Sequence, residues 1–383
     1  MTPISTTPEL ASLCRDLSSA DFIAVDTEFM REQTYYPKLC LIQVASSDAA
    51  ATIDPLARDL DLKPLWELMA QPGQVKVFHA ARQDLEIFHI ESGFIPAPVF
   101  DTQVAAMVCG FGDQISYVNL VRAVTGEQLD KSSRFTNWSK RPLTDKQLHY
   151  ALGDVTHLRD VYHHLRDELQ KSGRASWLDE EMAVLTNSST YEQHPEEAWQ
   201  RLKSKVKNRR SMAVLMSLAA WRERAAQKQD VPRQRILRDD ALYDIANQSP
   251  RSTEDLASLR SLGEGFSRSG RAKEIIAAVD EGLVRNIQDV PTLRHGQPLS
   301  AEATATLELL KVLLKSAAAR HGVAPRLIAD ASDLEQLARH ENPHVPALQG
   351  WRRDLFGADA LSLKRGELAL TLKDGDVTVI PAG

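Results

Sequence analysis

Short apolar stretches separated by polar turns fill the first 170 residues of the chain. Four of them have the length and composition of β-strands, namely residues 22–29, 39–46, 50–55 and 75–80. Helical periodicity occurs between and after them, in residues 62–70, 81–90, 102–110 and 145–169, the last with Thr144 as its N-cap. This alternation predicts an α/β domain built on a mixed sheet.

The strand signal disappears after about residue 175, and the pattern is helical from about 205 onward. VPRQRILRDDALYDIA at 231–246 resembles VAPRLIADASDLEQLA at 323–338, and each follows an amphipathic helical segment. We therefore expect two copies of one helical module. The final residues, ELALTLKDGDVTVI, alternate in period two around Asp374-Gly375 and predict a β-hairpin.

The composition of the 383 residues, 43% hydrophobic and 26% charged, is that of a soluble globular protein with two or three domains. The sequence contains no run of about 18 apolar residues, so it predicts no membrane span. The N-terminus lacks the pattern of a secretory signal. Cys14, Cys40 and Cys109 are scattered, without CxxC spacing. We therefore expect a reducing cytoplasm and no zinc site.

The net charge of −6 hides a strongly basic segment at residues 201–235. Eleven basic residues stand there against Glu223 and Asp230, which gives the segment a net charge of +9. Such a concentration in an acidic protein indicates either a contact with nucleic acid or a solvated helix face.

Asp26 and Glu28 stand at the end of the apolar strand FIAV. Residues two apart on a strand point to the same face, so these carboxylates converge. Oxygen ligands of this kind suit Mg²⁺ or Mn²⁺. A strand that runs out into solvent produces the same letters, so the pair alone is weak support for a metal site.

Three later residues change this interpretation. Asp84 follows the strand at 75–80 and begins a helix, where an acid is also favoured by the helix dipole. Tyr150 and Asp154 are four apart in a helical pattern and share a face. Four acids and a tyrosine gathered in one cluster suit a pair of divalent ions about 3.5–4 Å apart, acting on a phosphate.

The stretches VDTEF, HAARQDLEIF and YALGD resemble the three exonuclease motifs of the DEDD superfamily, in its tyrosine-bearing branch. FMREQTYYPKLCLIQVAS and LDKSSRFTNWSKRPLTDKQLHYALGDV extend the resemblance over about residues 20–170. It implies a ribonuclease H-like fold and two Mg²⁺ or Mn²⁺ ions. The helical modules resemble HRDC domains, the second copy being degenerate.

The resemblance implies a role for each motif residue. Asp26 bridges both ions, Glu28 and Asp154 complete the site whose water attacks phosphorus, and Asp84 supports the second ion. Tyr150 orients that water. The implied reaction removes nucleoside 5′-monophosphates from the 3′ end of RNA, with tails of tRNA precursors as the first expected substrate.

These patterns predict an exonuclease domain at residues 1–175, a linker at 176–207, HRDC-type domains at 208–287 and 295–365, and a hairpin at 366–383. The absence of a long heptad pattern favours a monomer.

The sequence signals for residues that contact the substrate are less specific. Each of these residues is expected to stack on bases or to pair with phosphates, and the alternative role of each is packing or solvation. They are Tyr36, Gln43, Lys131, Arg134, Trp138, Lys203, Lys205 and Lys207.

Asp101 has two interpretations as well, a further metal ligand or the cap of the following helix, which Thr102 also fits. Three alternative functions remain at the level of the sequence. The first is a DNA exonuclease with the same chemistry, because no motif reads a 2′-hydroxyl. The second is an inactive protein that binds nucleic acid through its HRDC modules, and the third is a domain in which the metal is only structural.

Overall fold

The computed structural model describes residues 2–130, 133, 136–203, 205–262, 265–292 and 299–382. The chain forms two compact units. Unit 1 contains residues 1–28, 39–190 and 298–383, and unit 2 contains residues 29–38 and 191–297. Within the described residues, none of the helices combines the length and apolarity that a membrane crossing requires.

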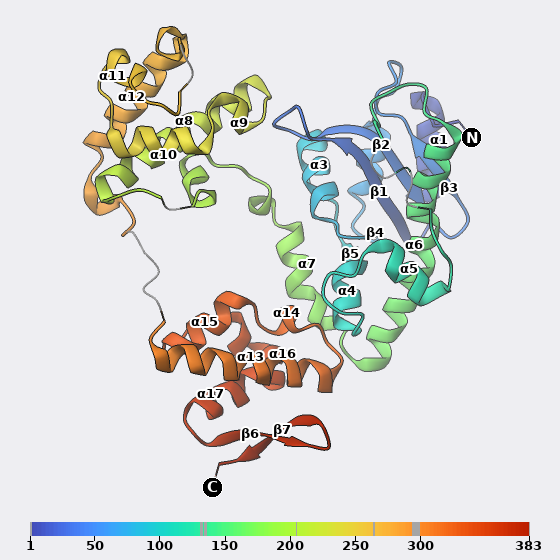
Figure 1. Cartoon of the computed structure of the whole chain (residues 1–383). Helices are drawn as coiled ribbons and strands as arrows, with labels where there is room; N and C mark the ends of the chain where they lie inside the picture. Colours follow the sequence, from blue (N-terminus) through green and yellow to red (C-terminus); the bar gives the residue numbers. More distant parts are fainter. Residues whose placement is uncertain are drawn as a thin grey trace. The chain divides into compact units, whose positions relative to one another are not determined.

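Unit 1 begins with a five-stranded sheet of strand order β3-β2-β1-β4-β5 (Figure 1). β1 pairs in parallel with β4, β4 pairs in parallel with β5, and β2 pairs antiparallel with β3, so the sheet is mixed as predicted. The elements of this part are α1 (Thr7–Leu17), β1 (Phe22–Met30), β2 (Lys38–Ala45), β3 (Ala50–Ile53), α2 (Lys63–Met69), β4 (Val75–Phe78), α3 (Arg82–Ser92), β5 (Val99–Asp101), α4 (Thr102–Val108), α5 (Tyr117–Thr125), α6 (Asp145–Ser172) and α7 (Asp179–Thr186).

The strands and helices expected from periodicity are present, whereas α1, α5 and β5 were not predicted. The start of α6 is fixed by a capping box, in which Thr144 accepts from the Gln147 amide and the Gln147 side chain accepts from the Thr144 amide. Gly173, in the left-handed conformation, ends the helix 28 residues later. α6 packs against β3 and β4, which brings its inner face to the sheet.

The C-terminal part of unit 1 shares a hydrophobic core with the α/β part. Ala105 and Val108 of α4 and Leu165 of α6 belong to the same buried cluster as Leu313 and Phe356. The elements of the C-terminal part are α13 (Ala301–His321), α14 (Pro325–Ile328), α15 (Ala331–Arg339), α16 (Gly350–Arg352), α17 (Ala358–Lys364), β6 (Leu368–Lys373) and β7 (Asp376–Pro381). The hairpin β6–β7 packs on α13 and α17 (Figure 1).

Stacked aromatic rings and a buried arginine reinforce this junction. Trp177 and Trp351 stack with ring centroids 4.4 Å apart and planes inclined by 4°. Arg352, 6% exposed, donates to the Leu327 carbonyl and pairs with the carboxylates of Glu180 and Glu181. The C-terminal part is therefore packed as an integral portion of unit 1.

Unit 2 is helical and has its own core, centred on the contact between its two long helices. Gly282 permits this close approach, because a Cβ there would lie 2.5 Å from the Val214 Cα. Its helices are α8 (Arg209–Gln229), α9 (Arg233–Ile236), α10 (Asp239–Gln248), α11 (Thr253–Ala257) and α12 (Gly270–Val284). α13, α14 and α15 begin 92 residues after α8, α9 and α10, which is the offset of the sequence repeat.

The segment Phe29–Lys38, which leads from β1 to β2, is anchored inside unit 2. The Tyr35 hydroxyl donates to buried Glu223 and accepts from Arg233 at 3.0 Å. The amides of Tyr35 and Tyr36 both donate to Asp230 Oδ1 at 3.0 Å. No pattern in the sequence predicts that this segment and the helical module fold as one body.

Candidate active site

The end of β1 and the middle of α6 bring three carboxylates together. Asp26, Glu28 and Asp154 each offer a carboxylate oxygen, and these oxygens all lie within 4.8 Å of one another. Asp26 and Glu28 share a face because they are two apart on β1. The expected convergence of these three residues is therefore present, although Asp154 follows Glu28 by 126 residues along the chain.

Asp84 lies beside this group, in the first turn of α3. Its carboxylate accepts a hydrogen bond from the hydroxyl of Thr27, the residue between Asp26 and Glu28 on β1, and its charge acts on Asp26. Burial raises the pKa of Asp84 to about 7, although the Thr27 hydrogen bond opposes this shift. Asp84 is 7% exposed, so its charge is poorly hydrated.

The carboxylates repel one another. Loss of hydration, followed by the charges of Asp84, Asp154 and Glu28, raises the pKa of Asp26 well above its usual range. A cation between the carboxylates removes both causes of the shift. All of the donors are hard oxygens, so the group fits Mg²⁺ or Mn²⁺ and does not fit a metal that prefers sulfur or nitrogen.

Tyr150 stands one turn before Asp154 on α6 and is hydrogen-bonded to its carboxylate. Burial and the charges of Asp154, Glu28 and Asp26 raise the pKa of Tyr150 above that of an ordinary phenol. Tyr150 therefore keeps its proton at neutral pH and serves as a hydrogen-bond donor. Trp138, 2% exposed, packs against it with ring centroids 6.1 Å apart.

A layer of side chains outside the predicted site lies next to the carboxylates. The Tyr117 hydroxyl, on α5, donates to the Gly153 carbonyl at 2.9 Å, next to Asp154. Its pKa is raised by burial and by the charges of Asp154 and Asp26, which places it close to the cluster. An aromatic residue at the start of an amphipathic helix has no sequence signal that separates this position from ordinary core packing.

His79 belongs to the same layer and is neutral, since burial lowers its pKa to about 4. The Thr102 hydroxyl donates to the Phe78 carbonyl at 3.0 Å, so it accepts from His79 Nδ1, also at 3.0 Å. This bond ties the end of β4 to the start of α4. His79 is thus held as a structural residue at the strand end.

The residues expected to contact the substrate are spread over both units. Tyr36 is 37% exposed in unit 2, whereas Gln43 is fully buried in β2 and its amide finds no hydrogen-bond partner in the described part of the chain. Lys131 and Arg134 lie outside the described residues. Contacts of these residues and of Trp138 with a nucleotide stay predictions, whereas the packing of Trp138 on Tyr150 is observed.

The basic segment 201–235 divides into two classes. Six of its arginines are engaged within unit 2, pairing with acids or capping carbonyls, and they are Arg201, Arg209, Arg210, Arg222, Arg224 and Arg233. Lys203, Lys205 and Lys207 are exposed and form no ion pair with any residue that the structure describes. Asn247 holds their backbone, accepting from the Lys207 amide at 2.9 Å and donating to the Lys205 carbonyl at 3.2 Å.

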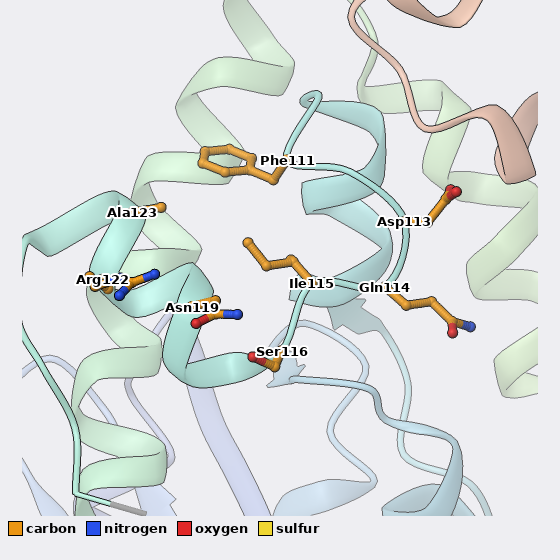
Figure 2. Close-up of a pocket in the computed structure, with 8 residues that line it drawn as sticks. All are labelled: Phe111, Asp113, Gln114, Ile115, Ser116, Asn119, Arg122 and Ala123. Atoms are coloured by element: carbon orange, nitrogen blue, oxygen red, sulfur yellow. The ribbon is translucent and has the colours of Figure 1, made fainter. Parts of the chain in front are cut away.

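A surface pocket lies beside α5 and contains none of the predicted site residues. Figure 2 shows the Phe111 and Ile115 side chains on the loop before α5, with Asn119 and Arg122 on the helix itself. Asp113 and Gln114 extend from the opposite side of the loop (Figure 2).

Comparisons with known proteins agree with this geometry. The family model described as a 3′-5′ exonuclease matches residues 1–170, and that of the HRDC domain matches residues 211–279. Ribonuclease D of Nitrobacter hamburgensis is 52% identical over 98% of both chains. Ribonuclease D of Granulibacter bethesdensis is 47% identical over 100% of this chain and 97% of its own.

Two solved structures match nearly the whole fold. Escherichia coli RNase D, described as an exoribonuclease involved in structured RNA processing, has a TM-score of 0.83 and 30% identity, covering 95% of this chain and 99% of its own. A protein from Bifidobacterium adolescentis has a TM-score of 0.69 and 20% identity, covering 96% of this chain and 97% of its own. The latter likeness concerns the fold alone.

Proposed function

Because the chain belongs to the ribonuclease D family of 3′-5′ exonucleases, we propose that Asp26, Glu28, Asp84 and Asp154 hold the two divalent cations with which it trims RNA. The enzyme is a hydrolytic exoribonuclease. The observation that supports the proposed site is the convergence of three carboxylates from β1 and α6 within 4.8 Å. We propose Mg²⁺ or Mn²⁺ as the cations, since every donor is an oxygen.

The bound cations supply charge stabilisation for displacement at phosphorus. The protein's own contribution is a rigid arrangement: the buried strand β1 fixes Asp26 and Glu28, and the capped helix α6 fixes Asp154. Tyr150 keeps its proton and donates it to the Asp154 carboxylate, so its oxygen is left to accept a hydrogen bond from the attacking water. This suits Tyr150 to orient that water rather than to deprotonate it. The products proposed are nucleoside 5′-monophosphates released from the 3′ end.

We propose tRNA precursors with 3′ tails, and other structured RNAs, as the substrates. Support comes from Lys203, Lys205 and Lys207, whose exposed ammonium groups suit contact with phosphates of a folded RNA. We also propose that the protein acts as a monomer in the cytoplasm, where its three free cysteines stay reduced.

A trimming assay tests the catalytic assignment. Wild type, Asp26→Asn and Asp154→Asn are incubated with a tRNA that carries a 3′ tail, with Mg²⁺, with Mn²⁺ or with a chelator. The expected result is metal-dependent release of nucleoside monophosphates by the wild type and loss of at least about a thousandfold in both variants. Full-rate trimming by both variants contradicts the assigned site.

Two further measurements test the substrate. Matched RNA and DNA oligonucleotides separate an RNA-specific enzyme from a DNA exonuclease, which degrades the DNA at least as fast. Neutralising Lys203, Lys205 and Lys207 to Gln is expected to reduce the slope of log affinity against log salt by about 2, at roughly 0.7 per phosphate contact. The matched control neutralises Lys63, Lys171 and Lys311, which already pair with acids on their own helices; an equal effect there refutes the lysine assignment.

A further inference from the structure

The turn between β4 and α3 decides where Asp84 lies. β4 ends at Phe78 and α3 begins at Arg82, so three residues reverse the chain. Ala80 has a φ of +59°, in the left-handed region that a residue with a Cβ rarely adopts. Ala81, at the N-cap, offers no side-chain hydrogen bond to the helix. The turn therefore needs support from outside its own sequence.

Asp101, at the end of β5, provides that support. β4 and β5 are paired so that Phe78 lies opposite Asp101. Asp101 Oδ1 accepts from the Ala80 amide at 3.0 Å, and Oδ2 accepts from the Ala81 amide at 2.9 Å. Oδ1 also accepts from the Gln103 amide at 2.8 Å, which caps α4. One buried carboxylate, 3% exposed, thus anchors the start of two helices.

We propose that Asp101 is a positioning residue that places Asp84 in the active site by holding the left-handed turn at Ala80. Asp84 is in the first turn of α3, only a few residues beyond the amides that Asp101 binds. Relaxation of the turn therefore moves Asp84 directly. This inference rests on the proposed function, in which Asp84 supports a divalent cation.

The same contacts exclude the other interpretation of Asp101 from the sequence. Both of its oxygens already accept backbone amides. Asp101 therefore acts on the metal site through the backbone and not as a ligand.

The experiment compares Mn²⁺ binding and trimming in wild type, Asp101→Asn and Asp101→Asn/Ala80→Gly. Binding is measured from free Mn²⁺ by electron paramagnetic resonance, and the trimming rate is measured against Mn²⁺ concentration. Loss of a residue that holds a metal ligand in place without contacting the metal typically weakens metal binding 10–100-fold. We expect at least about a tenfold weaker Mn²⁺ affinity in Asp101→Asn, with an unchanged KM for RNA at saturating Mn²⁺.

The double variant is the decisive arm. Glycine adopts a positive φ without steric cost, so Ala80→Gly is expected to recover part of the Mn²⁺ affinity although the carboxylate is still missing. Should Asp101→Asn fold poorly, Ala80→Val strains the same turn with Asp101 intact, and it is expected to weaken Mn²⁺ binding likewise. Wild-type Mn²⁺ affinity in Asp101→Asn, or in Ala80→Val, overturns the proposal.

A control separates positioning from loss of stability. Asp330 caps α15 in the C-terminal part of unit 1, as Asp101 caps α4. Asp330→Ala removes that cap and is expected to lower the melting temperature without changing Mn²⁺ affinity, and an equal shift in affinity overturns the proposal. Asp26→Asn is run in parallel. If Asp26→Asn trims RNA as wild type does, the proposed function fails. If Asp26→Asn is inactive and Asp101→Asn binds Mn²⁺ normally, only the role of Asp101 is rejected.

Discussion

Replacing Asp26 by Asn is expected to abolish trimming and yet to stabilise the metal-free protein. Asp26 lies among three other carboxylates, and its pKa is raised by lost hydration and by their charges. The substitution removes one charge from this group and keeps the shape of the side chain. In the absence of a cation, repulsion among the remaining carboxylates decreases, so the folded state gains relative to the unfolded state.

The magnitude follows from the separation of the carboxylates. Oxygens of Asp26, Glu28 and Asp154 lie within 4.8 Å of one another. At such a distance two unit charges repel by roughly 1 kcal/mol in water and by about 4 kcal/mol at an effective dielectric constant of about 20, and Asp26→Asn removes this repulsion. We therefore expect a gain on the order of 2 kcal/mol in the free energy of unfolding at pH 8, or roughly 4–8 °C in melting temperature.

The advantage of Asp26→Asn in stability is expected to depend on pH. Between about pH 4 and pH 7 the folded protein binds more protons at Asp84 than the unfolded chain does, so the stability of the metal-free wild type falls as pH rises through this interval. The stability of Asp26→Asn is expected to fall less over the same interval. Its advantage is therefore expected to be large at pH 8 and small at pH 5.

Thermal unfolding with a chelator at pH 5 and pH 8 measures both quantities, with Asp167→Asn as a surface control that removes a half-exposed charge on α6. Added Mn²⁺ is expected to raise the melting temperature of wild type more than that of Asp26→Asn. Equal or lower stability of Asp26→Asn at pH 8, or a pH-independent difference, refutes repulsion within the cluster.

Three further outcomes are expected. Tyr150→Phe lowers kcat about 10–100-fold at unchanged melting temperature, because only the hydroxyl group that orients the water is lost; a kcat equal to that of wild type contradicts its role. Gly282→Ala destabilises unit 2 by about 1–3 kcal/mol, since its Cβ would meet the backbone of α8, whereas Gly153→Ala, with its nearest neighbour at 3.9 Å, does not destabilise. Arg352→Met costs about 2–3 kcal/mol through the unpaired groups it leaves in unit 1, whereas Arg365→Met, at an exposed pair, has a much smaller effect. Similar losses of stability in thermal unfolding argue against the buried junction.

Motif residues were the most predictable part of the molecule. Asp26 and Glu28 follow a buried strand, and Tyr150 and Asp154 share a helix face, so local periodicity alone aligns each pair. The capping box at Thr144 likewise lies within four residues. The mixed sheet and the helical modules were predicted because their patterns repeat at fixed periods.

Partners distant along the chain were not predictable in the same way. Periodicity shows that a helix face is apolar, but not which surface covers it, so the core shared by α4 and α13 was not foreseen. A list of charges likewise does not show which ones are paired. Arg222 and Arg233 of the basic segment prove to be bound to Asp239 and Glu223, whereas the lysines at 203–207 stay exposed.

The shared core also bears on the order in which the protein is made. Ribosomes release the nuclease motifs first, but the side chains of α4 and α5 are covered in part by helices that begin at Ala301. Until those helices emerge, the nascent nuclease exposes apolar surface. Synthesis of the last segment is thus a folding step for the first, and we expect the ribosome-bound fragment that ends before it to acquire exonuclease activity poorly.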